Sequence, residues 1–197
     1  MPTHTSVTLT TTAHRIAFAA ISFLAPWATT AFPLLAGAVL VQKGIRLPQA
    51  LAYVEIAAFG PAIGTLLSGF IVDRIPRKVA VQICIFAMIA CGAVFASASV
   101  DVLILAASLL FSTFVALYLP TANVYFGEVH ATASRGRALS TLWAFNRLGA
   151  AISPLVLLPL LRSAGAGAMV AVIATALLLS SVLWVVCPPG STGQEID

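Results

Sequence analysis

The stretch Val102–Phe126 reads VLILAASLLFSTFVALYLPTANVYF and contains no charged residue. About 20 helical residues are needed to cross the hydrocarbon core of a bilayer, so this run is long enough to span it. Lipid offers no hydrogen-bond partner, and a spanning backbone must therefore bond to itself. A barrel strand would alternate polar and apolar residues over about 10 positions, and the run lacks that alternation. The stretch is predicted to be a transmembrane α-helix.

Five further apolar runs of similar length flank it. They are Ile16–Gln42, Leu51–Val72, Val79–Val100, Ala138–Leu161 and Gly167–Val186. The chain is therefore predicted to be an all-α polytopic membrane protein, with six transmembrane helices over residues 16–186. Residues 1–15, which are polar and Thr-rich, and residues 187–197, which include Pro-Pro-Gly, are expected to form disordered tails.

The composition indicates that lipid covers most of the surface. Of the 197 residues, 60% are hydrophobic and only 8% are charged, whereas about 25% are charged in a soluble domain. The mean hydropathy is +1.05. The formal net charge of +4 does not indicate nucleic-acid binding, because the basic residues lie in short links between the apolar runs.

Side chains that could carry catalysis are sparse. Cys84, Cys91 and Cys187 have neither metal-ligand nor disulfide spacing, and the three histidines are scattered. The apolar runs contain no serine paired with a histidine and no His-rich set. We therefore expect no catalytic residue, no metal and no cofactor, and the chain is predicted not to be an enzyme.

Lys and Arg are unevenly divided between the two sides of the predicted bundle. One side holds Arg15, Arg74, Arg77, Lys78, Arg135 and Arg137, and the other holds Lys43, Arg46 and Arg162. Links that carry more Lys and Arg remain in the cytoplasm. This bias predicts a multi-pass protein of the plasma membrane with both termini in the cytoplasm.

Prolines divide the runs into two sets of three. The first and fourth runs contain proline, as do the second and fifth, whereas the third and sixth contain none. The residues concerned are Pro26, Pro33, Pro61, Pro120, Pro154 and Pro159. This pattern predicts a 3+3 inverted repeat in which matching helices are interrupted along a substrate pathway. The alternative is that prolines are simply common in membrane helices.

Small residues recur along two of the runs. Gly60, Gly64 and Ser68 are spaced four apart in the second run, and Gly149 and Ser153 have the same spacing in the fifth. A face of small residues lets another helix approach closely. These residues are therefore expected to serve helix packing rather than chemistry.

The link between the second and third runs concentrates charge. It reads Gly69-Phe-Ile-Val-Asp73-Arg74-Ile-Pro76-Arg77-Lys78. So short a link, with one acid and three bases, is expected to form ion pairs between helix ends or to act as a positive anchor that contacts nothing. The stretch resembles the loop of the major facilitator superfamily, which has a Gly, three residues, Asp-Arg, any residue, Gly, then Arg and a second base. Pro76 stands where that family usually has Gly.

Two later stretches extend the resemblance. Tyr125-Phe-Gly-Glu128-Val-His-Ala-Thr132-Ala-Ser-Arg135 is similar to the link after the tenth helix in the metabolite:proton symporter and sugar-porter branches, with Gly127 and Ala131 in place of prolines. Arg147-Leu-Gly149-Ala-Ala-Ile-Ser-Pro154 is similar to the eleventh helix of organic-acid symporters. The resemblance covers Ile16–Val186 and implies the C-terminal six-helix half of such a transporter.

The resemblance also implies a cytoplasmic gate. Its ion-pair network would comprise Asp73, Arg74, Arg77, Glu128 and Arg135, formed in the outward-open state and broken when the protein opens inward. Exposed ion pairs contribute about 0–1 kcal/mol, and partly buried pairs contribute more. That scale suits a gate whose two states differ by a few kcal/mol.

Arg147 lies near the middle of the fifth run. An arginine there costs about 2.5–3.5 kcal/mol on insertion, which makes it a candidate functional residue. It is predicted to bind an anionic group of the solute, and the alternative is a structural pair with a carbonyl group or a neighbouring helix. Asn146 beside it, and Tyr118 and Asn123 on either side of Pro120, are further candidate substrate-binding residues.

Three more residues carry specific expectations. Glu55 is the candidate proton-coupling residue, because a carboxyl group buried in a membrane holds its proton more tightly. The alternative is that Glu55 lies in headgroup water. Tyr125 and Trp184 lie near helix ends and are expected to be interfacial anchors.

The sequence as a whole predicts secondary active transport of a small organic solute by alternating access. An organic acid or a sugar is the candidate solute, and proton coupling is the candidate driving force. Since the family's solute site lies between two halves, the expected partner is a second six-helix half, from another copy or from a separate chain. The alternative function is that of a truncated or degenerate half, acting as a non-transporting membrane scaffold or partner subunit.

Overall fold

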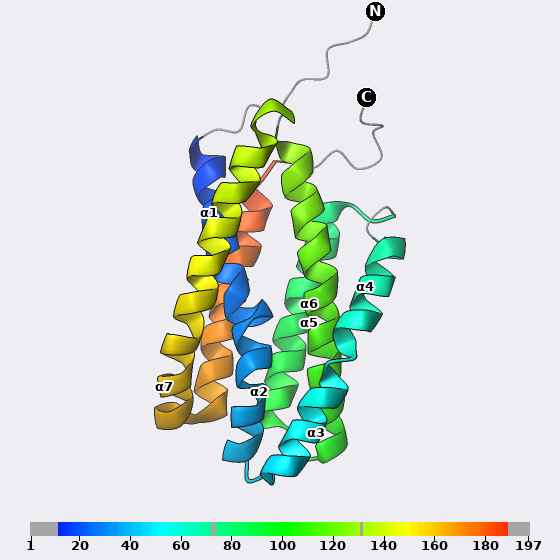
Figure 1. Ribbon diagram of the computed structural model, residues 1–197, viewed down its shortest axis with the longest axis vertical. Coiled ribbons are helices and arrows are strands. Elements are labelled where there is room, and N and C mark those ends of the chain that lie inside the picture. The colour runs from blue at the N-terminus through cyan, green and yellow to red at the C-terminus, as the bar shows by residue number, and fades with distance from the viewer. Residues whose placement is uncertain (1–11, 72–73, 131, 189–197) are drawn as a thin grey trace, which may run out of the picture.

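The computed structural model describes residues 12–71, 74–130 and 132–188, and its regular elements in these ranges are all α-helices. The all-α prediction is confirmed. Figure 1 shows the helices running roughly along one long axis, as a single elongated bundle. In chain order they are α1 (Thr12–Thr29), α2 (Ala31–Gln42), α3 (Leu47–Ala57), α4 (Gly60–Ile71), α5 (Arg77–Ser97), α6 (Asp101–Val129) and α7 (Thr132–Val186).

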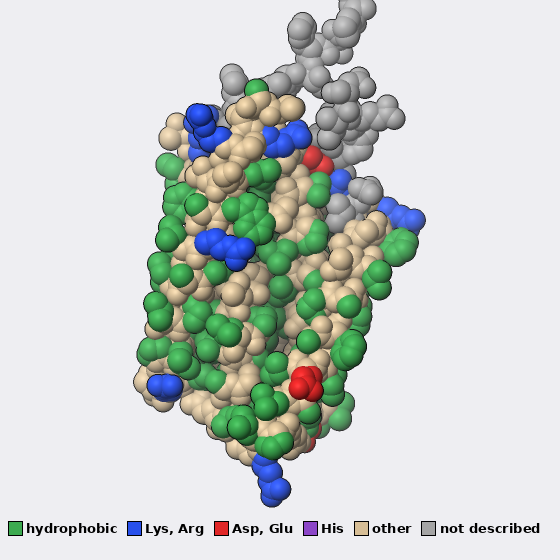
Figure 2. All heavy atoms as spheres, in the orientation of Figure 1, with side chains coloured by type: hydrophobic (Ala, Val, Ile, Leu, Met, Phe, Trp, Pro, Cys, Tyr) green, Lys and Arg blue, Asp and Glu red, His purple; other side chains and the backbone are tan. Residues whose placement is uncertain are grey.

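Within the described ranges, the helices form five segments that are long and apolar enough to cross a membrane. They are Thr12–Gln42, Leu47–Ile71, Arg77–Ser97, Asp101–Val129 and Thr132–Val186. Figure 2 shows hydrophobic side chains along the length of the visible face, with most Lys and Arg side chains toward its two ends. A surface of this kind is stable in lipid and not in water.

The 55 residues of α7 contain a reversal of the chain. A straight helix of that length would extend about 80 Å, far beyond the ~30 Å of a bilayer core. Gly165 has a φ of 84° and a ψ of 177°, which is not helical. At this residue the chain turns back and runs beside itself (Figure 1). We call residues 132–164 the first arm and residues 166–186 the return arm.

The position of the prolines explains the two interrupted segments. The first apolar segment breaks between α1 and α2 at Thr30, and the second breaks between α3 and α4 at Ala58 and Phe59. Pro33 and Pro61 follow these breaks and lie in the first turn of α2 and α4, where a missing N–H removes no helical hydrogen bond.

The prediction that the fourth and fifth apolar runs are interrupted at their prolines, to match the first and second runs, is wrong. α6 continues as helix through Pro120, and the first arm continues through Pro154 and Pro159. A proline inside a helix removes one backbone hydrogen bond, and tertiary packing can offset that loss. Around Pro120 the helix is held by buried neighbours, among them Tyr118 at 2% and Thr121 at 1% exposure.

The predicted tails fall mostly outside the described residues. Residues 1–11 and 189–197 lie outside them, so the expectation of disorder there stays a prediction. At the inner ends of both tails the chain is structured. α1 begins at Thr12, inside the predicted N-terminal tail, and Cys187 is buried.

The small residues pack two pairs of helices together, as the sequence predicts. A methyl group added at Gly60 would lie 2.6 Å from the carbonyl oxygen of Leu109 on α6. One added at Gly64 would lie 2.7 Å from the Cβ of Ala116. Ser68, the next residue of this face, is also buried. On the first arm, Gly149 lies directly against the backbone of Phe23 on α1.

Lys43 fastens the end of α2 to the end of α5. Its Nζ donates hydrogen bonds of 2.6 Å to the carbonyl oxygen of Phe95 and of 2.8 Å to that of Ala98. The carbonyl group of Phe95 lies in the last turn of α5 and that of Ala98 belongs to its C-cap, so neither has a helical N–H partner. The partial negative charge of a helix C-terminus attracts the ammonium group. Burial lowers the pKa of Lys43, although the side chain keeps its contact with the helix end.

Replacing Lys43 by methionine is expected to lower the free energy of unfolding by about 1–3 kcal/mol, because two hydrogen bonds from a charged donor are lost. Thermal unfolding of the purified chain in detergent measures this. Arg46→Gln, an exposed change at the same end of the bundle, is the control and should leave the transition unchanged. Equal shifts for the two variants would show that only the charge matters and not the contacts with α5.

Candidate functional site

A pocket opens between α1, α6 and the first arm of α7. We call it the interhelix pocket, and its walls are Ile21, Ser22, Ala25, Tyr118, Leu119, Ala122, Asn123, Phe126, Leu139, Leu142, Trp143 and Asn146. Three of the four predicted substrate-binding residues, Tyr118, Asn123 and Asn146, are among them. Most of the wall is apolar, with a few polar groups, which is the usual make-up of a small-molecule site.

The polar groups of the interhelix pocket come from all three helices. Asn123 is exposed on α6, and Asn146 lines the pocket from the first arm. The amide nitrogen of Asn146 donates a 3.4 Å hydrogen bond to the backbone oxygen of Ser22 on α1. A side-chain amide both donates and accepts hydrogen bonds. The two asparagines can therefore bind hydroxyl, carbonyl or carboxylate groups of a solute.

Arg147, the fourth predicted residue, lies beside the pocket rather than in its wall. It is exposed near the middle of the first arm, on a surface that is otherwise largely apolar. Its guanidinium carbon lies 5.5 Å from the ring centroid of Trp143. Arg147 forms no ion pair with any residue of the described ranges. The predicted structural alternative, a pair with a neighbouring helix, therefore gains no support among those residues.

Trp143 is the residue of this site that the sequence reasoning missed. It lines the interhelix pocket and also holds Arg147 over its ring. The signal was available, because residues four apart on a helix share a face. A tryptophan one turn before an intramembrane arginine is thus in position for a cation–π contact, which contributes about 0.5–2 kcal/mol depending on solvent exposure.

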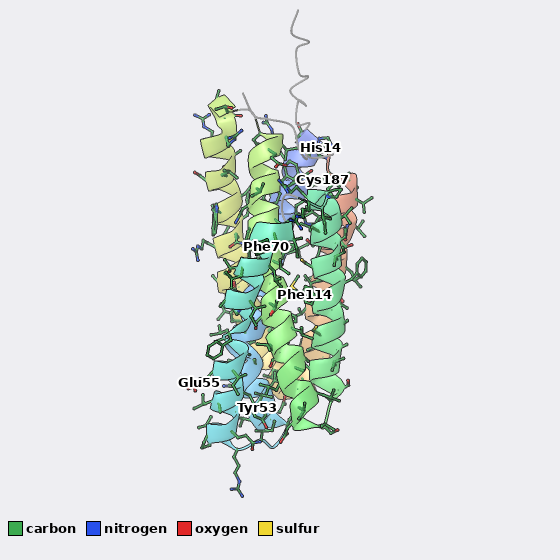
Figure 3. The ribbon with its side chains drawn as sticks, turned by 90° about the vertical axis from the view of Figure 1, so that its right-hand side faces the viewer. His14, Tyr53, Glu55, Phe70, Phe114 and Cys187 are labelled. Atoms are coloured by element: carbon green, nitrogen blue, oxygen red, sulfur yellow. The ribbon has the colours of Figure 1, made fainter. Side chains whose placement is uncertain are left out.

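Glu55 is not brought to this pocket. It lies exposed on α3, which contributes no residue to the pocket wall. Figure 3 shows it on the outer side of the bundle, far along the axis from His14 and Cys187. Glu55 has no ion-pair partner within the described ranges.

An ion pair joins the beginning of α5 to the end of α6. The Nε of Arg77 lies 3.3 Å from the Oε1 of Glu128, and the two side chains are only 8% and 9% exposed. Each charge lies at the unfavourable end of its own helix, because a helix N-terminus repels cations and a C-terminus repels anions. Neither residue therefore stabilises its own helix, and each is compensated by the other across the interface.

The other predicted members of the network are placed differently. Asp73 lies outside the described residues, and Arg74 is exposed. Arg135 lies in the first turn of α7, where its buried Nε has no hydrogen-bond partner among the residues that the structure describes. Of the five predicted residues, the described structure brings together Arg77 and Glu128.

Aromatic side chains pack together at the same end of the bundle. The ring of Trp184 lies 4.8 Å from that of Tyr125 and 5.5 Å from that of Phe126, and Tyr125 and Trp184 are both fully buried. The expectation that Tyr125 and Trp184 are interfacial anchors is therefore wrong. The reason is tertiary: the Tyr125 hydroxyl donates to the backbone oxygen of Pro188, so its polar group is satisfied inside the protein.

Hydrogen bonds hold the end of α7 and the residue that follows it beside these aromatic rings. The Nζ of Lys78 donates hydrogen bonds of 3.1 Å to the oxygen of Val185 and of 2.6 Å to that of Cys187. Burial raises the pKa of the Cys187 thiol to about 11, so the thiol is neutral at physiological pH. Lys78 and the end of the return arm thus form one packed layer with the aromatic rings at this end of the molecule.

The helical arrangement is similar to that of several solved transporters. A peptide transporter POT in complex with sulfate aligns with a TM-score of 0.77 and 17% identity, over 88% of this chain and 37% of its own. A D-xylose-proton symporter aligns with a TM-score of 0.70 and 15% identity, over 91% of this chain and 48% of its own. At such identities the likeness concerns the fold alone. The chain spans less than half the length of these transporters.

A family model identifies the chain more directly. The model described as Major Facilitator Superfamily matches residues 7–196, nearly the whole sequence. No curated protein is significantly similar to the chain. The match agrees with the charged link before α5, the buried ion pair behind it and the transporter fold. The chain is a membrane protein of the major facilitator superfamily.

Proposed function

We propose that this chain is one half of a secondary active transporter for a small organic solute, and that the interhelix pocket forms its side of the solute site. The observation that carries the proposal is the pocket itself. It combines two asparagine amides with an apolar wall, and an arginine without an ion-pair partner among the described residues lies next to it near the middle of the first arm. A charge at that depth is costly unless it serves a polar or anionic ligand.

Arg147 favours an organic acid over a neutral sugar. Its planar guanidinium can bind a carboxylate through two parallel hydrogen bonds, and the Trp143 ring restricts its orientation. The side chain is exposed, so it remains available to a ligand from the pocket or from a partner half. In a proton-coupled cycle, Glu55 is the proposed proton carrier, since it is the acid within the span Leu47–Ile71.

The proposed half has six crossings in a 3+3 inverted repeat. The reversal at Gly165 supports this count, because each arm of α7 is long enough to cross a bilayer. The excess of Lys and Arg at the end that holds Arg77 supports a cytoplasmic location of that end in the plasma membrane. The partner is a second six-helix half, and the solute site lies between the two.

The proposed gate is the Arg77–Glu128 pair together with the layer around it. A pair that is formed in one state and broken in the other biases alternating access by a few kcal/mol at most. The near-complete burial of both side chains supports this role over that of a plain positive anchor, because an anchor needs no acidic partner.

Replacing Arg147 by lysine is expected to weaken binding of an organic acid about tenfold, because lysine keeps the charge but cannot form two parallel hydrogen bonds. Binding is measured by ligand-dependent thermal stabilisation of the purified chain, and flux by uptake into proteoliposomes with and without a pH gradient. Arg162→Lys, at the exposed turn near Gly165, is the matched control and should bind as the native chain does.

Two results would count against the proposal. Unchanged affinity in an active Arg147→Lys variant would remove Arg147 from the site. Absence of both binding and flux for every organic acid and sugar, in the chain alone and in the presence of a second half, would favour the non-transporting scaffold instead.

A further inference from the structure

A second pocket lies between α1 and the first arm, at the end of the bundle where both helices begin. We call it the end pocket, and its walls are Arg15, Phe18, Ala19, His130, Ser134, Arg137, Ala138, Thr141 and Leu142. It shares only Leu142 with the interhelix pocket. Nothing in the proposed transport mechanism uses its polar residues, so it calls for a separate explanation.

The end pocket is basic. Arg15 extends into its lining from α1 and Arg137 from the first arm, and no acidic residue is among its described walls. Neither arginine forms an ion pair with a residue that the structure describes. Residues 1–14, which precede Arg15, also contain no Asp or Glu. Two guanidinium groups on facing helices, with no carboxylate of the described residues between them, are suited to an anion such as a phosphate.

His130 adds a polar ring at the end of α6. Its Nδ1 lies 2.7 Å from the backbone oxygen of Phe126, and a carbonyl oxygen only accepts, so we assign the ring proton to Nδ1. That assignment leaves Nε2 as a hydrogen-bond acceptor for a hydroxyl group in the pocket. The Phe18 ring, with its centroid 5.6 Å from that of His130, restricts the histidine ring to this position.

Of the remaining walls of the end pocket, Ser134 and Thr141 carry hydroxyl groups and the other four are apolar. Phe18, Ala19, Ala138 and Leu142 lie beyond the basic residues, toward the membrane-spanning part of α1 and the first arm. A free phosphate ion gains nothing from such walls, whereas a phospholipid places its headgroup phosphate at the water boundary and its acyl chains beside them. Basic pockets between transmembrane helices are suited to lipid headgroups of this kind.

We propose that the end pocket binds the headgroup phosphate of an anionic phospholipid, held by Arg15 and Arg137, with an acyl chain against the apolar walls. The site does not depend on the transport function proposed above. A non-transporting membrane scaffold with the same two helices would bind the lipid equally well. The ligand class follows from the combination of two guanidinium groups, neither of which forms an ion pair among the described residues, with apolar walls in a membrane protein.

Native mass spectrometry of the purified chain, titrated with phosphatidylglycerol, phosphatidylcholine or inorganic phosphate, tests the proposal. We expect phosphatidylglycerol to bind more tightly than phosphatidylcholine, and inorganic phosphate at equal concentration not to displace it. Each arginine near a lipid headgroup contributes about fivefold in affinity, so Arg15→Gln with Arg137→Gln should weaken phosphatidylglycerol binding about 25-fold. Binding of phosphatidylcholine should change little.

The matched control is Arg46→Gln with Arg162→Gln, which removes the same charge from the opposite end of the bundle. An equal loss in this control would overturn the proposal, since it would show a general effect of net charge. Displacement of the lipid by inorganic phosphate would overturn the lipid assignment in favour of a free anion. Equal binding of the two lipids to the native chain would overturn it without any variant, so the test does not depend on how the variants fold.

Discussion

Arg77→Gln is expected to lower the free energy of unfolding by about 3–5 kcal/mol, because it leaves the carboxylate of Glu128 buried without its partner. Both side chains are more than nine-tenths buried, so water cannot compensate the lost charge. Exposed ion pairs contribute far less, about 0–1 kcal/mol. Arg74→Gln is the matched control, since Arg74 lies three residues earlier in the same link but is exposed.

A double-mutant cycle separates this ion pair from the other contacts of Arg77. Glu128→Gln alone should also destabilise the chain, and the double variant should recover a large part of the loss because no unpaired charge remains. Thermal unfolding in detergent gives the three differences. Additive effects of the two substitutions would show that the pair is not a coupled unit, and the proposed gate would then have no basis.

The pair also predicts an effect on conformation. If the pair holds α5 and α6 together in one state of an alternating-access cycle, its loss shifts the population toward the state in which this end is open. Labelling of Cys187, a buried thiol in the layer at this end, should therefore become faster in Arg77→Gln than in Arg74→Gln. Equal labelling rates in the two variants would restrict the pair to a structural role.

The sequence was sufficient to predict that the chain is a membrane protein and that Lys and Arg gather at one end of its bundle, because both properties depend on local features. A run such as Val102–Phe126 has only one stable conformation in lipid, whatever surrounds it. The pairing of Arg77 with Glu128 was predicted as well, because the resemblance to a known family implies one ion-pair network that contains both residues. The small face of Gly60 and Gly64 was read from spacing alone, and it packs against α6 as predicted.

The features that were missed depend on tertiary context. Whether Pro120 breaks its helix is decided by the packing around α6 and not by the proline itself. Tyr125 lies near a helix end and would suit the membrane–water interface. Its hydroxyl, however, donates a hydrogen bond to the backbone oxygen of Pro188 inside the protein. Neither outcome can be read from local sequence, because each depends on contacts between segments that are distant in the chain.

Three of the predicted substrate-binding residues lie together in one pocket, and their role in binding a solute stays a prediction. Tyr118, Asn123 and Asn146 do line one pocket, whereas Glu55 lies on a helix that does not reach it. Helical periodicity places residues on a face, yet it does not say which faces meet across a bundle. The contact of Trp143 with Arg147, by contrast, follows from their separation of one helical turn.

Gly149→Ala is expected to destabilise the chain by about 1–3 kcal/mol, although alanine is the better helix former. The added Cβ would lie 3.0 Å from the carbonyl carbon of Phe23 and closer still to its oxygen. Backbone atoms cannot rotate away as a side chain can, so α1 and the first arm must separate. Gly136→Ala, in the same helix with nothing within 4 Å of its added methyl group, should instead gain about 0.5–1 kcal/mol from helix propensity.

The separation of α1 from the first arm should also change the geometry of the interhelix pocket, because both helices line it. Asn146 lies one turn before Gly149, and its 3.4 Å hydrogen bond to Ser22 has no room to lengthen. Gly149→Ala should therefore weaken solute binding at a temperature where the variant is still folded, while Gly136→Ala should not. A variant that loses stability but keeps full affinity would show that the pocket does not depend on the close approach of these two helices.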